Sequence, residues 1–174
     1  MYKKYIKRLL DVTISLILII LLFPLLTILY IITKLNFKGK AIFKQKRIGL
    51  NEKPFNIYKY KTMDDKTKST TKISRYLRDS GLDELPQLIN VLKGDMSLIG
   101  PRPFIVDDPL PIMYDELRHT VRPGITGYAQ ANGRRTNSHK EKLRLDNEYI
   151  KNLSFTLDLK IFFKSILDLI KSIF

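Results

Sequence analysis

Two adjacent carboxylates, Asp83 and Glu84, are the residues best suited to chemistry in this chain. Leucine and isoleucine follow them at positions 85, 88, 89 and 92, which is the spacing of one apolar helix face. We expect a helix over 82–92, with Asp83 as its N-cap, Pro86 in its first turn and Gly94 after its end. The start of a helix favours carboxylates and attracts phosphate, although an Asp–Glu pair alone is also typical of an ordinary capped helix.

Cations that could bind phosphate surround this pair in the sequence. Arg78 precedes it, and Arg102 follows it between Pro101 and Pro103, which fix the backbone on both sides. A guanidinium holds phosphate oxygens in a bidentate fork, so a stiffened arginine indicates an anion clamp; an exposed arginine in a rigid turn is the alternative. Lys59 lies on a predicted strand, where it either reaches a phosphate group or holds the chain against anionic lipid.

A further carboxylate, Asp146, lies within a helix predicted over 141–150. Leu143, Asn147 and Ile150 share its face, so we expect the carboxylate to point toward packed side chains. A buried carboxylate needs a cation or a metal ion as its partner. A plain salt bridge to an arginine explains Asp146 as well as an active-site role does.

The composition restricts the remaining chemistry. The 174 residues suffice for one compact domain, and the formal net charge of +14 indicates a polyanionic partner such as nucleic acid, an anionic membrane or a phosphorylated substrate. The absence of cysteine excludes disulfides and thiolate metal sites. His119 and His139 stand alone in polar surroundings, which predicts surface positions. Hard oxygen ligands remain, and these suit Mg²⁺.

The elements that position these groups begin with an apolar segment. Residues 12–33 carry no charge and are long enough to cross a membrane. Lysine and arginine flank the segment on both sides, so both ends are expected on the cytoplasmic side, and Pro24 should kink the helix. We therefore predict a re-entrant membrane helix over 1–34, bent at Pro24, and a cytoplasmic catalytic domain over 35–174. A kinked single-pass anchor is the alternative.

Two further patterns complete the predicted fold. Residues 41–48 and 55–61 indicate a small basic β-hairpin with a turn at 49–54. The tail from 157 to 174 has a charged stripe on an otherwise apolar helix, which suits a membrane interface; a helix packed on the domain core is the alternative. The expected fold is mixed α/β and mainly helical, with a membrane helix, a hairpin, a helical catalytic core and an interfacial C-terminal helix.

Several ordered blocks of this sequence resemble the monotopic phosphoglycosyl transferases, bacterial sugar transferases that start glycan assembly on a polyprenol phosphate. The resemblance covers nearly the whole chain, which is similar to the minimal catalytic form of that family. The blocks are Phe43–Gly49, Tyr58–Met63, Leu82–Ser97, Gly100–Pro103, Arg122–Gly127, Gly133-Arg134 and Leu145-Asp146 with Tyr149.

The resemblance implies a reaction and a role for each matching residue. A UDP-sugar donates its sugar 1-phosphate to undecaprenyl phosphate, a polyprenol phosphate, and UMP is released. Asp83 is the nucleophile that forms a covalent aspartyl phosphosugar, and Glu84 helps to hold Mg²⁺ beside it. Family positions that bind phosphate or nucleotide, or that lie in the active site, are matched by Lys59, Arg78, Arg102, Arg134 and Asp146.

The resemblance also implies partners and a place in the cell. These are membrane lipids of the bacterial inner membrane, a catalytic domain on its cytoplasmic face, and downstream glycosyltransferases of exopolysaccharide or capsule synthesis. The alternative is a non-enzymatic, membrane-anchored basic module that binds nucleic acid or anionic lipid. That module accounts for the charge but gives no reason for an Asp–Glu pair ringed by cations. Because neither stacking platforms nor a recognition helix is evident, we expect no nucleic acid partner.

Overall fold

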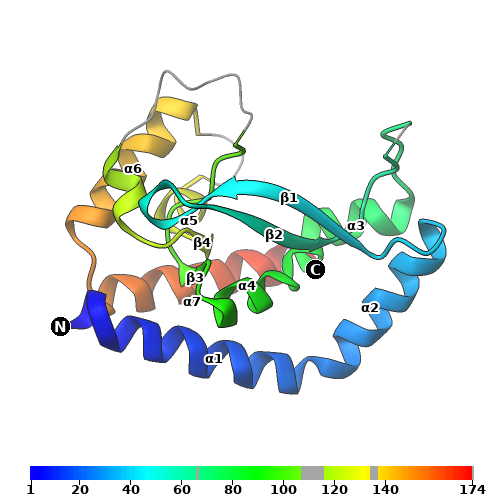
Figure 1. The fold of residues 1–174 in the computed structure, drawn as a ribbon, viewed down its shortest axis with the longest axis horizontal. Coiled ribbons are helices and arrows are strands. Elements are labelled where there is room, and N and C mark those ends of the chain that lie inside the picture. The colour runs from blue at the N-terminus through cyan, green and yellow to red at the C-terminus, as the bar shows by residue number, and fades with distance from the viewer. Residues whose placement is uncertain (66, 107–115, 134–136, 174) are drawn as a thin grey trace.

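The computed structural model describes residues 1–65, 67–106, 116–133 and 137–173. Most of these residues are helical, and they include two sheets of two strands each, so the fold is mixed α/β and mainly helical, as predicted. In chain order the elements are a π-helical turn (Tyr2–Ile6), α1 (Lys7–Leu21), α2 (Phe23–Asn36), β1 (Ile42–Ile48), β2 (Pro54–Tyr60), α3 (Lys72–Ser80), α4 (Gln87–Lys93), β3 (Ser97–Ile99), β4 (Gly124–Thr126), α5 (Tyr128–Ala131), α6 (His139–Lys151) and α7 (Phe155–Ile173), with 3₁₀ turns at Leu50–Glu52, Leu82–Glu84 and Glu116–Thr120 (Figure 1).

The helices α1 and α2 form a bent apolar pair along one side of the molecule (Figure 1). They are separated by Leu22, which leaves helical geometry with φ −91° and ψ 5°. Pro24 lies in the first turn of α2, where the lack of an N–H is tolerated. Without this N–H, Pro24 cannot continue the hydrogen-bonding pattern of α1. The predicted break is therefore confirmed. Among the described residues no single helix is long and apolar enough to cross a membrane; Tyr2–Leu21 and Phe23–Asn36 meet that test only together, with a bend of 69°.

The first turns of α1 are fixed to α4 and β3 by polar contacts. Arg8 donates to the carbonyls of Val91 (2.6 Å) and Leu92 (3.0 Å) in the last turn of α4. A cation is favourable there because the carbonyl end of a helix carries partial negative charge, although the Val91 carbonyl also accepts from Gly94 N (3.0 Å). Asp11 is buried and accepts a hydrogen bond from the backbone N–H of Leu98 in β3 (3.0 Å). The helix α1 therefore packs on α4 and β3, the two elements that follow the Asp–Glu pair.

The strands β1 and β2 form the predicted antiparallel hairpin, in which Phe43 lies opposite Lys59. Side chains alternate between the faces of a strand, so Ile57 and Lys59 point to the same side. Ile57 is buried against Val91 and Met96, which places this face of the hairpin on the region of α4. Lys59 consequently reaches the turn that holds the Asp–Glu pair.

The strands β3 and β4 form a short parallel pair that the sequence pattern did not indicate. A Cβ atom on Gly124 would overlap the backbone nitrogen of Gly100, and a Cβ on Gly127 would overlap the carbonyl oxygen of Gly100. Only glycine permits two backbones to approach so closely. This contact places the loop of residues 100–103, which carries Arg102, against the segment around β4.

A hydrophobic core joins α6 and α7 to β3. Tyr149 and Ile150 of α6 are buried together with Ile161 of α7 and Ile99 of β3. The predicted helices over 141–150 and 157–174 are confirmed as α6 and α7, with slightly different ends. The last residue of the second prediction, position 174, lies outside the described residues. One face of α7 packs on this core, and the other carries exposed apolar side chains, namely Phe155, Leu159, Phe163, Ile166, Leu167 and Ile170.

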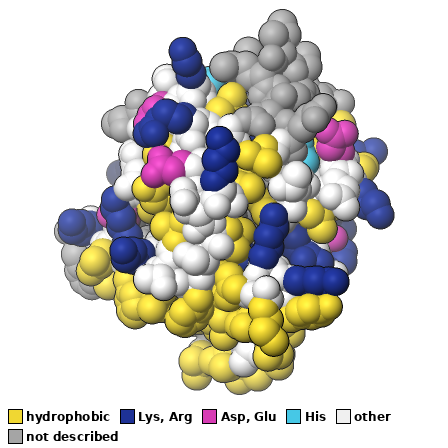
Figure 2. Space-filling model, turned by 90° about the vertical axis from the view of Figure 1, so that its left-hand side faces the viewer, with side chains coloured by type: hydrophobic (Ala, Val, Ile, Leu, Met, Phe, Trp, Pro, Cys, Tyr) yellow, Lys and Arg dark blue, Asp and Glu magenta, His cyan; other side chains and the backbone are white. Residues whose placement is uncertain are grey.

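Hydrophobic side chains gather along one edge of the molecule, with lysine and arginine next to them (Figure 2). This edge corresponds to the side on which α1 and α2 lie in Figure 1. Both helices expose large apolar side chains, which include Leu9, Leu16, Ile17, Ile20, Leu21, Phe23, Ile28, Ile31 and Leu35.

Candidate active site

The sequence predicted that the Asp83–Glu84 pair, here called the dyad, lies at the start of a helix over 82–92. The pair lies instead in a short 3₁₀ turn. The preceding helix α3 ends at Gly81, whose φ of +74° suits glycine. The next helix, α4, begins only at Gln87. Pro86 has no N–H to donate to the carbonyl four residues earlier, so a regular helix does not continue through the dyad.

The predicted buried face of α4 also needs correction. Leu88 is buried, but Ile89 is 49% exposed, and the neighbouring Asn90 is buried instead. The Asn90 side chain accepts from the backbone N–H of Tyr58 (3.0 Å) and donates to the carbonyl of Asn56 (2.7 Å). These two bonds to β2 satisfy the buried amide and set the rotation of α4 beneath the hairpin, against the apolar spacing.

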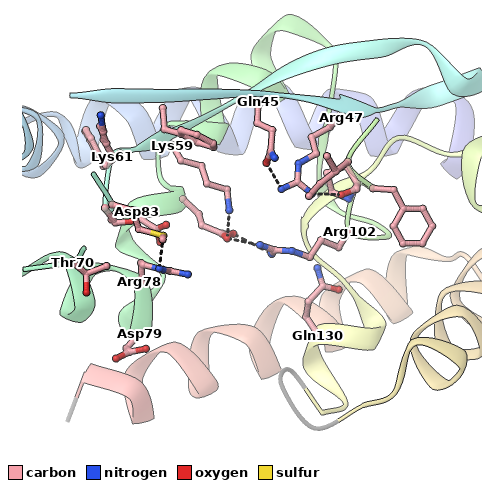
Figure 3. Close-up of a pocket in the computed structure, with 18 of the residues that line it drawn as sticks. Gln45, Arg47, Lys59, Lys61, Thr70, Arg78, Asp79, Asp83, Arg102 and Gln130 are labelled. Atoms are coloured by element: carbon pink, nitrogen blue, oxygen red, sulfur yellow. Dashed lines mark hydrogen bonds and ion pairs between the residues drawn. The ribbon is translucent and has the colours of Figure 1, made fainter. Parts of the chain in front are cut away.

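A cavity of about 960 Å³ opens beside the dyad. Figure 3 shows side chains from the hairpin, from α3 and from the loop after β3 converging on it. The structure brings nearly all of the predicted site residues to this cavity. Its lining includes Lys59, Arg78, Asp83, Glu84, Arg102 and Asp146. Arg134 lies outside the described residues.

Glu84 is held by two cations from different parts of the chain. Lys59 Nζ lies 2.7 Å and Arg102 Nη2 lies 2.8 Å from Glu84 Oε1 (Figure 3). Burial by itself would raise the pKa of Glu84, but the charges and hydrogen bonds of Arg102 and Lys59 lower it to about 2. The Glu84 carboxylate is therefore ionised at neutral pH and compensated by its partners.

Asp83 has a different environment. Its side chain is buried, and it makes no hydrogen bond or ion pair with any residue that the structure describes. Burial, followed by the charge of Glu84, raises the pKa of Asp83 to about 6, although Lys59, Arg78 and Arg102 act in the opposite direction. At neutral pH the carboxylate is mostly ionised and unpaired, so its oxygens are available to react.

Arg78 approaches the dyad from α3 (Figure 3). Its guanidinium donates to Met63 Sδ (3.0 Å), and sulfur is a weak acceptor. Most of its hydrogen-bonding capacity is therefore left for an anion. Together with Lys59 and Arg102 it surrounds two carboxylates with three positive charges, an excess that favours a phosphorylated ligand.

Asp146 is buried, as predicted, and its partner is Arg118. Asp146 Oδ2 lies 3.0 Å from Arg118 Nη2, and both side chains are at most 5% exposed. Burial raises the pKa of Asp146 to about 6, while the charge of Arg118 opposes this rise. Of the two interpretations of Asp146, the structure supports the salt bridge to an arginine.

Other residues of the cavity were missed in the sequence. Arg47 donates to Gln45 Oε1 (2.6 Å) and to the carbonyl of Pro103 (3.0 Å), and its place on a basic strand is the signal that could have found it. Gln130 also lines the cavity, and both polar atoms of its amide are buried without a hydrogen-bond partner. A glutamine between two turn-rich segments gives no sequence signal for such a position.

The two histidines differ. His139 is exposed at the start of α6, as predicted, but His119 is buried, at 6% exposure. The surface prediction was wrong for His119 because the 3₁₀ turn that carries it packs against α6. Polar neighbours in sequence did not reveal this contact.

The described residues contain no cluster of three or more His, Cys, Asp or Glu side chains that could hold a metal ion. The dyad nevertheless offers hard oxygen ligands, since Asp83 is unpaired and Glu84 Oε2 has only a 3.5 Å contact with Arg102 Nη1. Mg²⁺ is usually bound by one or two carboxylates together with substrate phosphates. The donor set therefore fits a magnesium ion that binds with a diphosphate.

Three known proteins that this chain resembles are named as sugar transferases or sugar phosphotransferases. The chain is 44% identical over 166 residues to the uncharacterized sugar transferase EpsL of Bacillus subtilis (strain 168), which is 89% of this chain and 82% of that protein. It is 40% identical over 181 residues to the UDP-glucose:undecaprenyl-phosphate glucose-1-phosphate transferase of Klebsiella pneumoniae. It is 37% identical over 181 residues to the UDP-N-acetylgalactosamine-undecaprenyl-phosphate N-acetylgalactosaminephosphotransferase of Aeromonas hydrophila.

The extent of these matches differs between the relatives. The chain spans 39% of the length of the Klebsiella protein and 43% of the Aeromonas protein, whereas those alignments cover 92% and 93% of this chain. The model of the protein family described as bacterial sugar transferase matches residues 2–172, which include the dyad and the cations around it. These matches support an enzyme over a basic module that only binds nucleic acid or lipid. The chain belongs to the bacterial sugar transferase family.

Proposed function

We propose that the protein transfers a sugar 1-phosphate from a UDP-sugar to undecaprenyl phosphate and releases UMP. Family membership and the activities named for the Klebsiella and Aeromonas relatives support this proposal. The observation that carries it is the contrast within the dyad. Glu84 is compensated by Lys59 and Arg102, whereas Asp83 beside it is buried, ionisable and unpaired among the described residues.

Asp83 supplies the nucleophile of a two-step reaction. One carboxylate oxygen attacks the phosphorus that bears the sugar, and a new oxygen–phosphorus bond forms. The bond from this phosphorus to the bridging oxygen breaks, and UMP leaves with the electron pair. A phosphate oxygen of undecaprenyl phosphate then attacks the same phosphorus and releases Asp83 as a carboxylate. Each step exchanges one phosphorus–oxygen bond for another, so no oxidant or further reactant is needed.

The surrounding cations stabilise the charge that develops during both steps. Lys59 and Arg102 are held in place by Glu84 at 2.7 and 2.8 Å, and Arg78 faces the dyad from α3. Charges fixed in advance stabilise phosphoryl oxygens without reorganisation at the moment of reaction. Mg²⁺, when it is bound by the dyad and the diphosphate, supplies further neutralisation of the phosphates.

We also infer that α1 and α2 enter the inner membrane of a bacterium from the cytoplasmic side and return to it. The basic flanks, the 69° bend and the exposed apolar side chains of α1, α2 and α7 support this topology (Figure 2). The contacts of Arg8 with α4 support it as well, because they keep the amino terminus beside the catalytic core. Such an arrangement brings the dyad to the height of a lipid phosphate, and downstream glycosyltransferases would use the product.

Release of UMP by the purified protein tests the proposed reaction. UDP-glucose and UDP-N-acetylgalactosamine are the first donors to try, with undecaprenyl phosphate as acceptor. Asp83→Asn should abolish UMP release with the fold intact, because an amide cannot form the acyl phosphate, and Glu84→Gln should be severely impaired. Arg144→Gln is the control, since this arginine is 60% exposed and pairs with surface glutamates.

Mass spectrometry of the protein after incubation with donor alone tests the covalent step. We expect a sugar phosphate on the peptide that contains Asp83 and none in Asp83→Asn. An adduct on a different residue, or UMP release by Asp83→Asn at the wild-type rate, would contradict the proposed role.

A further inference from the structure

Arg118 is the centre of a buried set of contacts between α6 and the loop that carries Arg102. Its guanidinium lies 3.0 Å from Asp146 Oδ2 and donates to the carbonyl of Arg102 at 2.7 Å. The same group stacks on the ring of Phe104, with 3.5 Å between Arg118 Cζ and the ring centroid. The Arg118 side chain is 5% exposed, so these contacts are shielded from water.

The backbone around Arg102 is held at three successive carbonyls. The carbonyl of Pro101 accepts from Gly124 N (2.9 Å), and that of Pro103 accepts from Arg47 Nη1 (3.0 Å). Arg118 holds the carbonyl between them. The two prolines have no N–H groups of their own, so these external donors fix the direction in which the Arg102 side chain leaves the loop.

We propose that Arg118 is a positioning residue for the phosphate-binding side chain of Arg102, and that Asp146 acts through Arg118 rather than by touching the substrate. This inference rests on the proposed function, in which Arg102 binds Glu84 and faces the donor phosphates. The contacts run from Asp146 to Arg118, from Arg118 to the backbone of Arg102, and from the Arg102 side chain to Glu84.

The chemistry of these contacts requires arginine. A planar guanidinium can pair with a carboxylate, donate to a carbonyl and stack on a ring at the same time, whereas an ammonium group cannot do all three. A buried ion pair is often no more stabilising than apolar side chains of the same volume, so stability alone does not explain this one. Precise placement of Arg102 gives this ion pair a function, because an error of about 1 Å in a catalytic site can lower the rate roughly 100-fold.

A double-mutant cycle between Arg118→Lys and Arg102→Lys tests the proposal. Arg118→Lys should lower kcat for UMP release by roughly ten- to a hundredfold. In the Arg102→Lys background the same change should lower kcat by about twofold or less, because the effects of substituting residues that act as one unit are not additive. A loss that is equal in both backgrounds, or a wild-type rate for Arg118→Lys, would overturn the proposal.

Asp146→Asn separates the two possible roles of this carboxylate. If Asp146 acts through Arg118, then Asp146→Asn causes little further loss in an Arg118→Lys background. A large further loss there would assign Asp146 to the substrate and overturn the second half of the proposal. Arg144→Lys, on the exposed side of α6, is the matched control and should keep the wild-type rate.

Two more measurements keep the test decisive. Thermal unfolding shows whether each variant is folded; if Arg118→Lys is not, Phe104→Leu replaces it in the same cycle, because it removes the stacked ring and keeps both polar contacts. Calorimetric titration with UDP gives a second cycle on affinity, which needs no turnover. A wild type that binds UDP but releases no UMP would contradict the proposed reaction, while the affinity cycle would still confirm or overturn the positioning role.

Discussion

Asp83 and Glu84 are adjacent in the chain, yet the pKa of Asp83 is raised to about 6 and that of Glu84 is lowered to about 2. The difference arises because Lys59 and Arg102 both contact Glu84 Oε1 and leave Asp83 buried beside a negative charge. Two carboxylates whose pKa values are pushed apart can take different roles. In the proposed reaction Glu84 holds the cations, and Asp83 is free to attack.

The rate of the first half-reaction should rise with pH through about 6. Only the ionised form of Asp83 can attack phosphorus, and burial together with the charge of Glu84 sets its pKa near that value. The measurement is the burst of UMP from a UDP-sugar without acceptor, so that titration of the lipid phosphate does not contribute. Arg78→Gln should move the acidic limb to higher pH, because Arg78 lowers the pKa of Asp83.

Arg144→Gln is the control for this profile, since Arg144 lies on the exposed side of α6. Its acidic limb should coincide with that of the wild type. A limb that stays in place in Arg78→Gln, or a burst rate that does not change with pH across this range, would contradict the assignment of Asp83.

The raised pKa of Asp83 should also make the protein less stable as pH rises, whereas the rate of the first half-reaction increases. The folded protein binds the Asp83 proton more tightly than the unfolded chain does, so Asp83 lowers the free energy of unfolding as pH rises from 3.8 to about 6. In thermal unfolding experiments across this pH range, the stability of Asp83→Asn should therefore decrease less with rising pH than that of the wild type. An identical pH dependence for both proteins would argue against a raised pKa.

Removal of divalent metal should stop the reaction. The dyad offers two carboxylates and the described residues offer no larger cluster, so a magnesium ion needs the phosphates of the donor to complete its ligands. UMP release should vanish in excess EDTA and return with Mg²⁺ or Mn²⁺. Full activity in EDTA would defeat this prediction.

Local signals in the sequence were sufficient for several elements of the fold. The strand pattern over 41–48 and the alternation over 55–61 gave the hairpin, Pro24 gave the break between α1 and α2, and helical spacing gave α6. The contact between Gly100 and Gly124 could not be predicted in this way, because it joins two segments that only the tertiary fold brings together. The rotation of α4 was mispredicted for a related reason, since the bonds of Asn90 to β2 outweighed the apolar spacing.

The candidate site shows the same limit. The residue types of the dyad and of Lys59, Arg78 and Arg102 indicated phosphate chemistry before their geometry was known. Nothing in the sequence showed which arginine pairs with Asp146, because the chain has 31 arginines and lysines and their spacing assigns none of them to this helix. The partner, Arg118, is found only from the packing of its 3₁₀ turn against α6.

The ion pair between Lys7 and Asp158 should stabilise the attachment of α1. Its Nζ–Oδ2 distance is 2.7 Å, the side chains are 11% and 7% exposed, and Asp158 also accepts from the hydroxyl of Tyr149 (2.8 Å). Asp158→Asn would leave the Lys7 charge buried without its counter-ion, which typically lowers stability by about 3–5 kcal/mol. Glu141→Gln, whose partner is largely exposed, should leave the thermal midpoint nearly unchanged. Equal midpoints for the two variants would contradict this role.

A re-entrant α1–α2 pair predicts that both ends of the segment face the cytoplasm. The chain has no cysteine, so single cysteines at Lys4 and Lys140, which are both exposed, can be labelled selectively. Both should resist a membrane-impermeant thiol reagent in intact cells and react after lysis. Labelling of position 4 alone in intact cells would mean a full span with an external amino terminus.

Pro24→Ala tests whether the break itself sets this topology. Alanine restores the missing N–H, so a continuous apolar helix long enough to cross the bilayer becomes possible. The basic residues before the segment oppose its inversion, and Arg8 is additionally bound to the carbonyls of Val91 and Leu92. We therefore expect partial labelling of position 4 and a partial loss of activity in Pro24→Ala, and more of both when Arg8→Ala is added. Unchanged labelling and activity in the double variant would show that the bend does not determine how the chain sits in the membrane.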